Sequence, residues 1–338
     1  MSGGPSLAVV GAGAWGTTLA TLLSKAAPVT LLARDEAHAA TLRTDGENKR
    51  YLPGVPLDER VSVTADPSDL GAATELVVFA VPSRAMRSSV VSVAGSLSES
   101  AVLLSVAKGI EAGSLLRMTE VIASEVPDAA GRVAALSGPN LALEISRGLP
   151  AAAVVGAVDD EVSRRAVDIL GGRTFRLYRN RDIVGVELAG ALKNIVAIVA
   201  GAVEELGAGD NAKAAITTRG LAEMTRLGAA MGANPLTFAG LAGIGDILAT
   251  STSALSRNHR LGVELASGRP WSEIEGTLPG VAEGAYTVQA AVELARRHEV
   301  EVPIADQVHA VLYEGKDVRA SVVDLLARSS KDELTGEA

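Results

Sequence analysis

Short runs of consecutive apolar residues recur through the first half of the chain and alternate with helical or turn-rich stretches. A run that is apolar at every position predicts a strand covered on both faces, whereas a half-exposed strand alternates apolar and polar residues. The first half is therefore predicted to form an α/β domain in which a mostly parallel sheet is flanked by helices. The predicted strands are residues 7–10, 29–32, 61–64, 76–81, 102–107, 133–136, 151–155 and 175–178.

This rhythm stops after about Asp182. Long segments follow whose apolar residues recur at helical spacing, and the second half is accordingly predicted to be all-α. The clearest of these segments are residues 184–204, 212–231 and 286–298. We expect an α/β domain over residues 1–184, a helical domain over residues 185–330, and a frayed polar tail over residues 331–338.

The composition fits this division and limits the partners. A chain of 338 residues can bury two cores, and 35 glycines with only 3% aromatic residues suit close packing of helices on a sheet. The formal net charge of −9 argues against nucleic acid as a partner, because a phosphate polymer requires a broad basic face. A small anionic substrate is compatible with this charge, since a pocket needs only a few local cations.

Several kinds of site and location are excluded by what the sequence lacks. Cysteine is absent, which excludes disulfides, thiolate metal sites and cysteine nucleophiles. The four histidines are scattered without ligand spacing, so no bound metal is expected. The first residues have no secretory signal, and the longest apolar run, residues 195–203, is far shorter than the roughly 20 residues of a membrane span. We expect a cytoplasmic protein without an integral membrane segment.

A glycine-rich loop follows the first predicted strand and opens an apolar helical stretch. Gly11, Gly13 and Gly16 form the pattern G-x-G-x-x-G, with Ala14 and Trp15 at its variable positions. The first glycine permits a tight turn, the second lets a pyrophosphate approach the backbone, and the third allows the helix to pack closely on the strand. An ordinary glycine-rich turn is the alternative, but the strand–turn–helix context favours a dinucleotide cofactor, NAD(H) or NADP(H).

The end of the second predicted strand bears on the choice between these two cofactors. A strict NAD enzyme usually has an acidic residue at this strand tip, where it binds the ribose hydroxyls. Here Arg34 could pair with the 2′-phosphate of NADP(H) or be a solvated surface charge. Asp35 could be the acid displaced by one residue or only a helix cap. The sequence leaves both questions open.

Lys193 lies in a predicted helix, residues 186–202, that is otherwise almost wholly apolar. Its neighbours at three and four residues are small or apolar, and no carboxylate on its own helix can neutralise it. A buried ammonium is costly, so the side chain must extend to solvent, lose its proton or find a partner elsewhere. The small neighbours also leave room for a ligand beside it.

Three other polar groups are candidates for chemistry. Asp246 ends a glycine-rich turn that enters a helix, and by itself this pattern predicts an N-cap. Residues 256–260 form the densest polar stretch of the second half, where an arginine fork suits a phosphate, although a surface basic cluster fits as well. Lys108 follows a predicted strand, and ligands of doubly wound sheets bind beyond the carboxyl ends of strands.

Taken together, the chain resembles the NAD-dependent, bacterial-type glycerol-3-phosphate dehydrogenases over essentially its whole length. The motifs that carry this resemblance are residues 11–17, 51–55, 107–110, 136–140, 187–195, 243–246, 256–258 and 281–284. The resemblance implies a Rossmann-type N-terminal domain, a helical C-terminal domain and an active site between them. It also implies a homodimer and the reversible reduction of dihydroxyacetone phosphate to sn-glycerol 3-phosphate, which supplies membrane phospholipid synthesis.

The resemblance also implies roles for individual residues. Lys193 is the implied general acid/base, which protonates the carbonyl oxygen as hydride arrives, and Asp246 is implied to orient it. The implied substrate-binding residues are Lys108, Gly138, Asn140, Lys193, Asn194, Asp246, Thr250, Ser256, Arg257 and Asn258. The implied cofactor-binding residues are Gly11, Gly13, Ala14, Trp15, Gly16, Arg34, Lys108, Ala142, Arg257, Val281 and Glu283.

The chain departs from the family pattern at two positions of its motifs. Asn140 stands where the family often has serine or threonine, which weakens its assignment, and Ala282 stands where valine is common. His259 and Arg260 have no implied role and are predicted to be solvated surface residues.

Two alternatives share the dinucleotide fingerprint. A hydroxyacid dehydrogenase or ketopantoate reductase has a similar architecture and sometimes a lysine, but the polar cluster at residues 256–258 and the Gly245–Asp246 turn tell against it. A non-catalytic NAD(P)-binding redox sensor would not need Lys193, Asp246 and Arg257 together. A sensor that binds DNA would also carry a basic helix, which the sequence does not contain.

Overall fold

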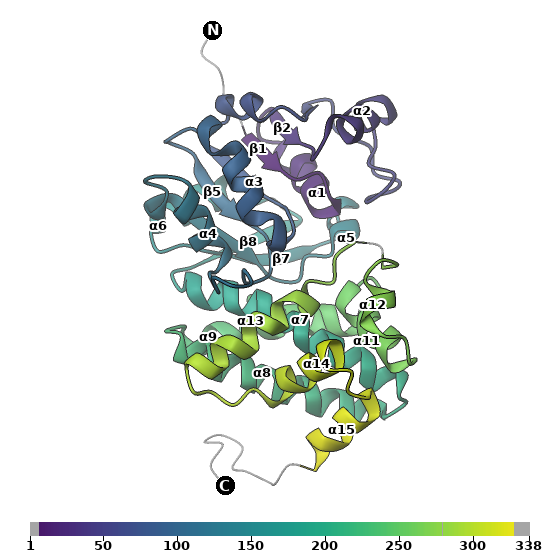
Figure 1. The fold of residues 1–338 in the computed structure, drawn as a ribbon. Coiled ribbons are helices and arrows are strands. Elements are labelled where there is room, and N and C mark those ends of the chain that lie inside the picture. Colours follow the sequence, from purple (N-terminus) through teal and green to yellow (C-terminus); the bar gives the residue numbers. More distant parts are fainter. Residues whose placement is uncertain (1–6, 279, 328–338) are drawn as a thin grey trace.

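The computed structural model describes residues 7–278 and 280–327. The predicted tail over residues 331–338 lies outside this range. A part built on one sheet and a part built of helices follow each other along the chain (Figure 1). Each predicted strand run overlaps one observed strand, which confirms the α/β class. The strands are β1 (Leu7–Val10), β2 (Val29–Leu32), β3 (Val61–Thr64), β4 (Leu76–Phe79), β5 (Val102–Ser105), β6 (Val133–Ser137), β7 (Ala151–Gly156) and β8 (Phe175–Asn180).

The eight strands form one sheet in the order β3-β2-β1-β4-β5-β6-β7-β8. Neighbouring strands are parallel except β6 and β7, which are antiparallel and pair Leu136 with Val155. The strands from β1 to β6 therefore end at one common edge, where ligands of such sheets bind. From β7 onward the chain runs in the opposite direction.

Helices cover both faces of this sheet. One face packs its buried Leu, Val and Ala side chains on α1, α2, α5 and α6, and the other face packs on α3 and α4. This two-sided cover explains why the central strands are apolar at every position. These helices are α1 (Ala14–Leu23), α2 (Glu36–Asp45), α3 (Met86–Val93), α4 (Met118–Glu125), α5 (Ala142–Ser146) and α6 (Asp160–Leu170).

The helical part is built around α7, which packs on α8, α10, α11, α13 and α14. Two glycines allow the closest of these crossings. A Cβ on Gly201 of α7 would lie 2.0 Å from the carbonyl oxygen of His259, and a Cβ on Gly262 of α11 would lie 1.9 Å from that of Ile198. The helices are α7 (Ile183–Glu205), α8 (Gly209–Ala230), α9 (Pro235–Phe238), α10 (Asp246–Thr252), α11 (Arg257–Ala266), α12 (Trp271–Ile274), α13 (Glu283–Arg297), α14 (Pro303–Tyr313) and α15 (Val318–Leu326).

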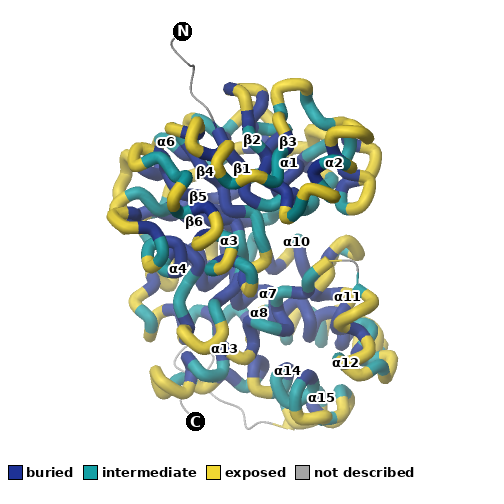
Figure 2. Tube along the Cα trace, turned by 45° about the horizontal axis from the view of Figure 1, so that its top comes forward, coloured by how far each residue is buried: buried dark blue, intermediate teal, exposed yellow. Residues whose placement is uncertain are grey.

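Helix α7 belongs to both parts. Its first turns lie on the sheet, where a Cβ on Gly156 of β7 would lie 3.0 Å from the Val186 side chain, and Ser137 at the end of β6 faces Gly190. Its later turns form the centre of the helical part. Figure 2 shows α7 buried between the two parts. The reversal at β7 produces this path, because α7 can then run toward the ligand-binding edge.

One helix among the described residues, α7, is long and apolar enough to cross a membrane by length and composition. It is almost entirely buried inside the protein. The bent pair formed by residues 235–252 and 257–266 passes the same test only when the two are taken together. The apolar composition of α7 is thus that of a core helix.

Candidate active site

The loop between β1 and α1 has the geometry that a pyrophosphate site requires. Gly11 has φ +107°, and a Cβ there would lie 2.7 Å from the carbonyl oxygen of Ala80. A Cβ on Gly16 would lie 1.8 Å from the carbonyl oxygen of Gly11, whereas one on Gly13 would meet no atom within 4 Å. The outer glycines are therefore needed for packing, and the middle glycine leaves open space at the N-terminus of α1, whose first N–H groups have no helical acceptor.

Asn48 supports this loop, although nothing in the sequence singled it out. Its buried Nδ2 donates to the carbonyl oxygen of Ala12 at 3.0 Å and to Thr17 Oγ1 at 2.7 Å. Trp15 packs edge-on against Phe175, with 6.1 Å between the ring centroids. Both contacts join segments that are distant in the sequence, so no local pattern could have revealed them.

The contacts at the tip of β2 decide between the two predicted roles of Asp35, a ribose-binding acid and a helix cap. One of its oxygens accepts the His38 backbone N–H at 2.8 Å, which caps α2, and the other accepts Arg34 Nε at 3.1 Å. These bonds lower the pKa of the Asp35 carboxyl, the His38 backbone bond contributing most. Asp35 is thus a helix cap. The Arg34 side chain is 80% exposed and can turn toward a ligand at this strand tip.

Lys193 finds its partner on another helix. The residue is 6% exposed, and its Nζ lies 2.6 Å from Thr250 Oγ1 and 3.1 Å from Asp246 Oδ1, both on α10. Thr250 in turn donates to Asp246 Oδ1 at 3.0 Å. Of the three outcomes open to a lysine on an apolar helix, the structure shows an interhelical ion pair.

Asp246 joins this lysine to a second one. Its Oδ2 lies 2.5 Å from Lys108 Nζ, which also donates to the carbonyl oxygen of Gly138 at 2.7 Å. The prediction that Asp246 caps its helix is wrong. It is the first residue of α10, after a π-helical turn at Leu241–Gly245, and its carboxylate makes no capping bond. Both oxygens face the lysines instead.

Burial and charge act in opposite directions on this group of residues. Burial lowers the pKa of the Lys193 ammonium to about 8; Asp246 opposes this shift and Lys108 adds to it. Burial raises the pKa of the Asp246 carboxyl, but the ammonium groups of Lys108 and Lys193 outweigh it and hold that pKa below its usual range. The pair therefore combines an ionised carboxylate with an amine that exchanges its proton near neutral pH.

Two asparagines tie the surrounding elements together. Asn194 Nδ2 donates to the carbonyl oxygen of Lys108 at 3.0 Å, and its Oδ1 accepts Asn258 Nδ2 at 2.8 Å. Asn258 Oδ1 accepts the backbone N–H of Gly284 at 2.9 Å. This chain of bonds links the β5 tip to α7, α11 and α13. The two amide side chains therefore hold the elements that surround the site.

The residues of the polar cluster at the start of α11 differ in their contacts and burial. Ser256 is the N-cap, and its hydroxyl accepts the His259 backbone N–H at 3.2 Å. Arg257 is exposed and makes no hydrogen bond or ion pair with any residue that the structure describes, and it lies against Gly280.

The prediction that His259 is a solvated surface residue is wrong. It is buried where α11 crosses α7, with its Nε2 3.3 Å from Glu204, whereas Arg260 is exposed as predicted.

Asn140 and Glu283 differ in how they are paired. Both polar atoms of the Asn140 side chain are buried and lack a hydrogen-bond partner among the described residues. Glu283 accepts bonds from the backbone N–H of Ser83, at 3.0 Å, and from its hydroxyl. Sequence reasoning missed Ser83, which follows the tip of β4 and could have been found by the same strand-end rule as Lys108.

The predicted cofactor positions Ala142 and Val281 have only structural contacts. The carbonyl oxygen of Ala142, at the start of α5, accepts Thr18 Oγ1 of α1 at 3.3 Å. Val281 is half-buried just before α13. The structure thus brings together Lys108, Gly138, Lys193, Asp246 and Thr250 in one bonded group, with the glycine loop, Arg34 and Arg257 outside it.

Comparisons with known proteins match the whole chain. Residues 6–163 match the model of the NAD-dependent glycerol-3-phosphate dehydrogenase N-terminus, and residues 182–323 match that of its C-terminus. The glycerol-3-phosphate dehydrogenase [NAD(P)+] of Moorella thermoacetica is 46% identical over 97% of this chain and 98% of its own length. That of Citrifermentans bemidjiense is 44% identical over 97% and 98%. A crystal structure of glycerol-3-phosphate dehydrogenase from Coxiella burnetii superimposes with a TM-score of 0.90 at 36% identity and covers 96% of this chain and 99% of the other.

Proposed function

The chain belongs to the family of NAD-dependent glycerol-3-phosphate dehydrogenases, and from this membership we propose that Lys193 and Asp246 are its catalytic pair. The protein is an NAD(P)-dependent oxidoreductase that interconverts dihydroxyacetone phosphate and sn-glycerol 3-phosphate. The proposed site is supported chiefly by one observation. A buried ammonium on an apolar helix is bonded to a buried carboxylate beside the ligand-binding edge of the sheet.

The chemistry requires one hydride and one proton. The nicotinamide ring supplies the hydride to the ketone carbon when the cofactor is bound. Lys193 donates a proton from Nζ to the carbonyl oxygen, which becomes the hydroxyl, and in oxidation the neutral amine takes that proton back. The pKa of about 8 suits both directions, since a general acid/base works best when its pKa lies near the operating pH.

Asp246 and Thr250 orient the amine. The carboxylate holds the ammonium from one side and the Thr250 hydroxyl fixes its position, so the remaining N–H can point at a substrate oxygen. Lys108 lies on the other oxygen of Asp246 and adds positive charge where the alkoxide develops. The unpaired Asn140 amide and the carbonyl oxygen of Gly138 are further candidates for substrate hydroxyl contacts.

The phosphate end of the substrate is assigned to the start of α11. Arg257 makes no hydrogen bond or ion pair with the described residues, although the Glu283 carboxylate attracts its charge, and its fork can bind a phosphate through two parallel bonds. Ser256 and Asn258 flank it, and Asn194 is bonded to Asn258. The same Arg257 can reach the cofactor, as can Lys108, because both lie between the two parts of the chain.

The cofactor is NAD(H) or NADP(H). The open side of Gly13 and the α1 N-terminus, with Gly11, Ala14, Trp15 and Gly16, fit the pyrophosphate. Arg34 is assigned to the adenosine end. Val281 and Glu283 are assigned to the nicotinamide end, and Ala142 is a further assigned cofactor contact.

The cellular role follows from the reaction. Reduction supplies glycerol 3-phosphate for phospholipid synthesis, and we assign the enzyme to the cytoplasm and to a homodimer.

Replacement of Lys193 by alanine tests the catalytic pair. Lys193→Ala is expected to lower kcat by roughly a hundredfold to ten-thousandfold, the usual contribution of a general acid/base. Binding of NADH, measured by fluorescence titration, should change little. Lys25→Ala, which removes an exposed lysine after α1, is the control and should keep normal turnover. Near-normal kcat in Lys193→Ala would refute the role.

Replacement of Arg257 by alanine tests the phosphate contact. The expected result is a rise of roughly tenfold to a hundredfold in the KM for dihydroxyacetone phosphate, because a bond to a charged group contributes about 1.5–3 kcal/mol. Arg260→Ala removes the neighbouring exposed arginine and should leave KM unchanged. An unchanged KM in Arg257→Ala contradicts the assignment.

A further inference from the structure

The segment between β5 and α4, residues 108–117, is attached to α7 at both of its ends, and we call it the 108–117 loop. At its start, the Lys108 carbonyl oxygen accepts Asn194 Nδ2 at 3.0 Å. At its end, Arg117 donates to Glu187. Glu187 and Asn194 are seven residues apart, about two helical turns, so they lie on the same face of α7. One helix face therefore holds both ends of the loop.

Glu187 makes the attachment at the α4 end with both carboxylate oxygens. Its Oε1 accepts the Thr119 backbone N–H at 2.9 Å, and its Oε2 accepts Thr119 Oγ1 at 2.6 Å and Arg117 Nη1 at 2.5 Å. The side chains of Glu187 and Arg117 are 4% and 13% exposed. Burial raises the pKa of the Glu187 carboxyl and these partners oppose the rise, so the charged form depends on them. Arg117 also pairs with Glu120 at 2.7 Å, so removing the Glu187 charge leaves Arg117 with this partner, whereas removing Arg117 leaves the Glu187 carboxylate buried without a cation.

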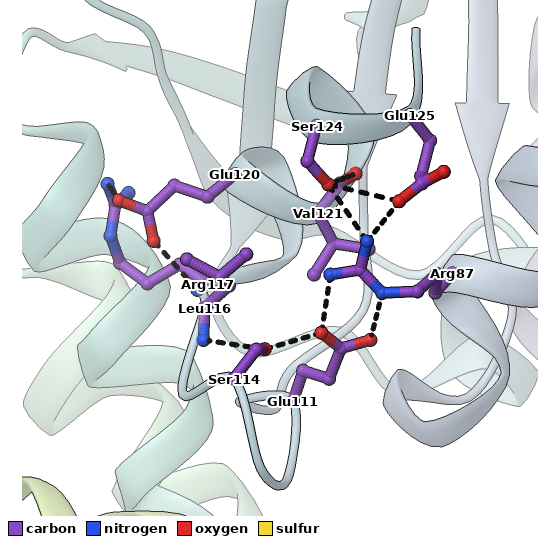
Figure 3. A network of polar contacts seen from close by, with 9 residues as sticks. All are labelled: Arg87, Glu111, Ser114, Leu116, Arg117, Glu120, Val121, Ser124 and Glu125. Atoms are coloured by element: carbon purple, nitrogen blue, oxygen red, sulfur yellow. Dashed lines mark hydrogen bonds and ion pairs between the residues drawn. The ribbon is translucent and has the colours of Figure 1, made fainter.

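The outer side of the 108–117 loop is fastened separately, to the sheet part. Arg87 of α3 donates to both oxygens of the Glu111 carboxylate, at 2.9 and 2.6 Å, and Ser114 donates to the same carboxylate. Figure 3 shows this cluster on one side of the loop and the Arg117 side chain on the other. The Arg87 cluster thus fastens the loop to α3, whereas Glu187 fastens it to α7.

The first residue of the loop carries a charge on which the site depends. Lys108 Nζ lies 2.5 Å from Asp246 Oδ2, and its charge contributes to the lowered pKa of Lys193. If Lys108 moved away, Lys193 would lose a repelling neighbour and Asp246 would be free to bind Lys193 alone. Both changes favour the charged form of Lys193.

We propose that Glu187 is a positioning residue of the dehydrogenase site: its bonds to Arg117 and Thr119 hold the 108–117 loop on α7, so that Lys108 stays on Asp246. The inference rests on the proposed function, because it concerns the proton that Lys193 transfers. Glu187 lies almost two turns before Lys193 on α7 and acts only through the loop.

The test is the pH dependence of kcat in Glu187→Gln, which keeps the size of the side chain and removes its charge. The reaction measured is glycerol 3-phosphate oxidation at saturating substrate and cofactor, in which the neutral form of Lys193 is the active one. In the wild type kcat should rise with pH through the pKa that Lys193 has in the enzyme–substrate complex. In Glu187→Gln the inflection should move upward by roughly half a pH unit or more, and kcat at neutral pH should fall accordingly.

Two further variants separate positioning from simple destabilisation. Glu223→Gln is the matched control, because Glu223 is another buried carboxylate, which accepts the backbone N–H groups of Ile304 and Ala305 at 2.8 and 2.9 Å. It should lower Tm without moving the inflection. Lys108→Met removes the charge directly and should move the inflection upward, and adding Glu187→Gln to it should move the inflection no further.

Each outcome bears on the inference. A shift in Lys108→Met without one in Glu187→Gln overturns the positioning role and leaves the proposed function standing. A shift in Glu187→Gln that persists in the Lys108→Met background also overturns it, since the effect would not pass through Lys108. If neither variant shifts, the inference fails, and substantial turnover in Lys193→Ala would then remove the proposed function as well.

Discussion

A lysine buried in the middle of an apolar helix must find a partner or lose its proton. Lys193 has a charged partner and also a lowered pKa. It lies 3.1 Å from the Asp246 carboxylate and 2.6 Å from Thr250, and burial lowers its pKa to about 8. A group that titrates near neutral pH can both give and take a proton. The lowered pKa that burial causes is therefore the property that the proposed acid/base role requires.

We propose that a single side chain, Arg34, discriminates between the two cofactors. With Asp35 occupied as the α2 cap, the exposed guanidinium is free to pair with a 2′-phosphate. Arg34→Ala is expected to raise the KM for NADPH by roughly tenfold to a hundredfold, the loss of a charge-assisted bond, and to leave the KM for NADH within about twofold. Steady-state kinetics with each cofactor measures this difference.

Arg60→Ala, which removes another half-exposed arginine of the sheet part, should alter neither KM and serves as the control. Equal changes in the KM values for NADPH and NADH in Arg34→Ala would show that the side chain does not bind the 2′-phosphate.

Individual side chains show where sequence reasoning succeeds and where it ends. The isolation of Lys193 among apolar residues could be predicted, because it depends only on helical spacing. The burial of His259 could not, because it arises where α11 crosses α7. The capping role predicted for Asp246 was wrong because a π-helical turn shifts the start of α10 to that residue. Tertiary packing decided the burial of His259, and the local path of the backbone decided the position of Asp246.

Among the elements, the strands were the most predictable. Their apolar runs reflect helices on both faces, and the eight runs match β1 to β8. The direction of β7 could not be predicted, since an apolar run reads the same for a parallel and an antiparallel neighbour. This one reversal decides where α7 runs and so where Lys193 lies.

The crossing of α7 and α11 depends on glycine. A Cβ on Gly262 would lie 1.9 Å from the Ile198 carbonyl oxygen, and backbone at that distance must move. Gly262→Ala is therefore expected to lower the free energy of unfolding by about 1–3 kcal/mol, the usual effect of overpacking, and to lower Tm. Because α11 begins with Arg257, the KM for dihydroxyacetone phosphate should rise as well.

The control for this substitution is Gly276→Ala. Gly276 is exposed, and a Cβ there meets no atom within 4 Å. Its effect on the free energy of unfolding, measured by denaturant titration, should stay within about 0.5 kcal/mol. A Gly262→Ala protein as stable as Gly276→Ala would contradict the close crossing.

For the molecule as a whole, α7 is the element that joins the sheet to the helices. The predicted domain boundary between residues 184 and 185 falls inside its first turn, and that division stays a prediction. The core of the helical part includes Ala135 and Val154 from the sheet, packed with Val186 of α7. The two halves of the site are therefore held by one rigid helix.

The proposed homodimer is tested on the intact protein. One chain has a mass of 34.4 kDa, so light scattering on an eluting peak should give about twice that value. The ratio should persist on dilution to the concentrations used in activity assays. A single peak at the mass of one chain would contradict the proposed assembly.

The reversal of β7 also limits how this chain can be recombined with others. A chimera that takes its nucleotide-binding half from another dehydrogenase, with the crossover after β8, would pair foreign β6 and β7 with a native α7. The first turns of that helix lie against Gly156, where a Cβ would lie 3.0 Å from Val186, so even an alanine in the donor would force a shift. We expect that a workable exchange moves β6, β7 and α7 as one cassette, and α7 is the helix that carries the proposed catalytic Lys193. Cofactor preference and the proposed proton transfer are therefore expected to be exchanged together at this junction.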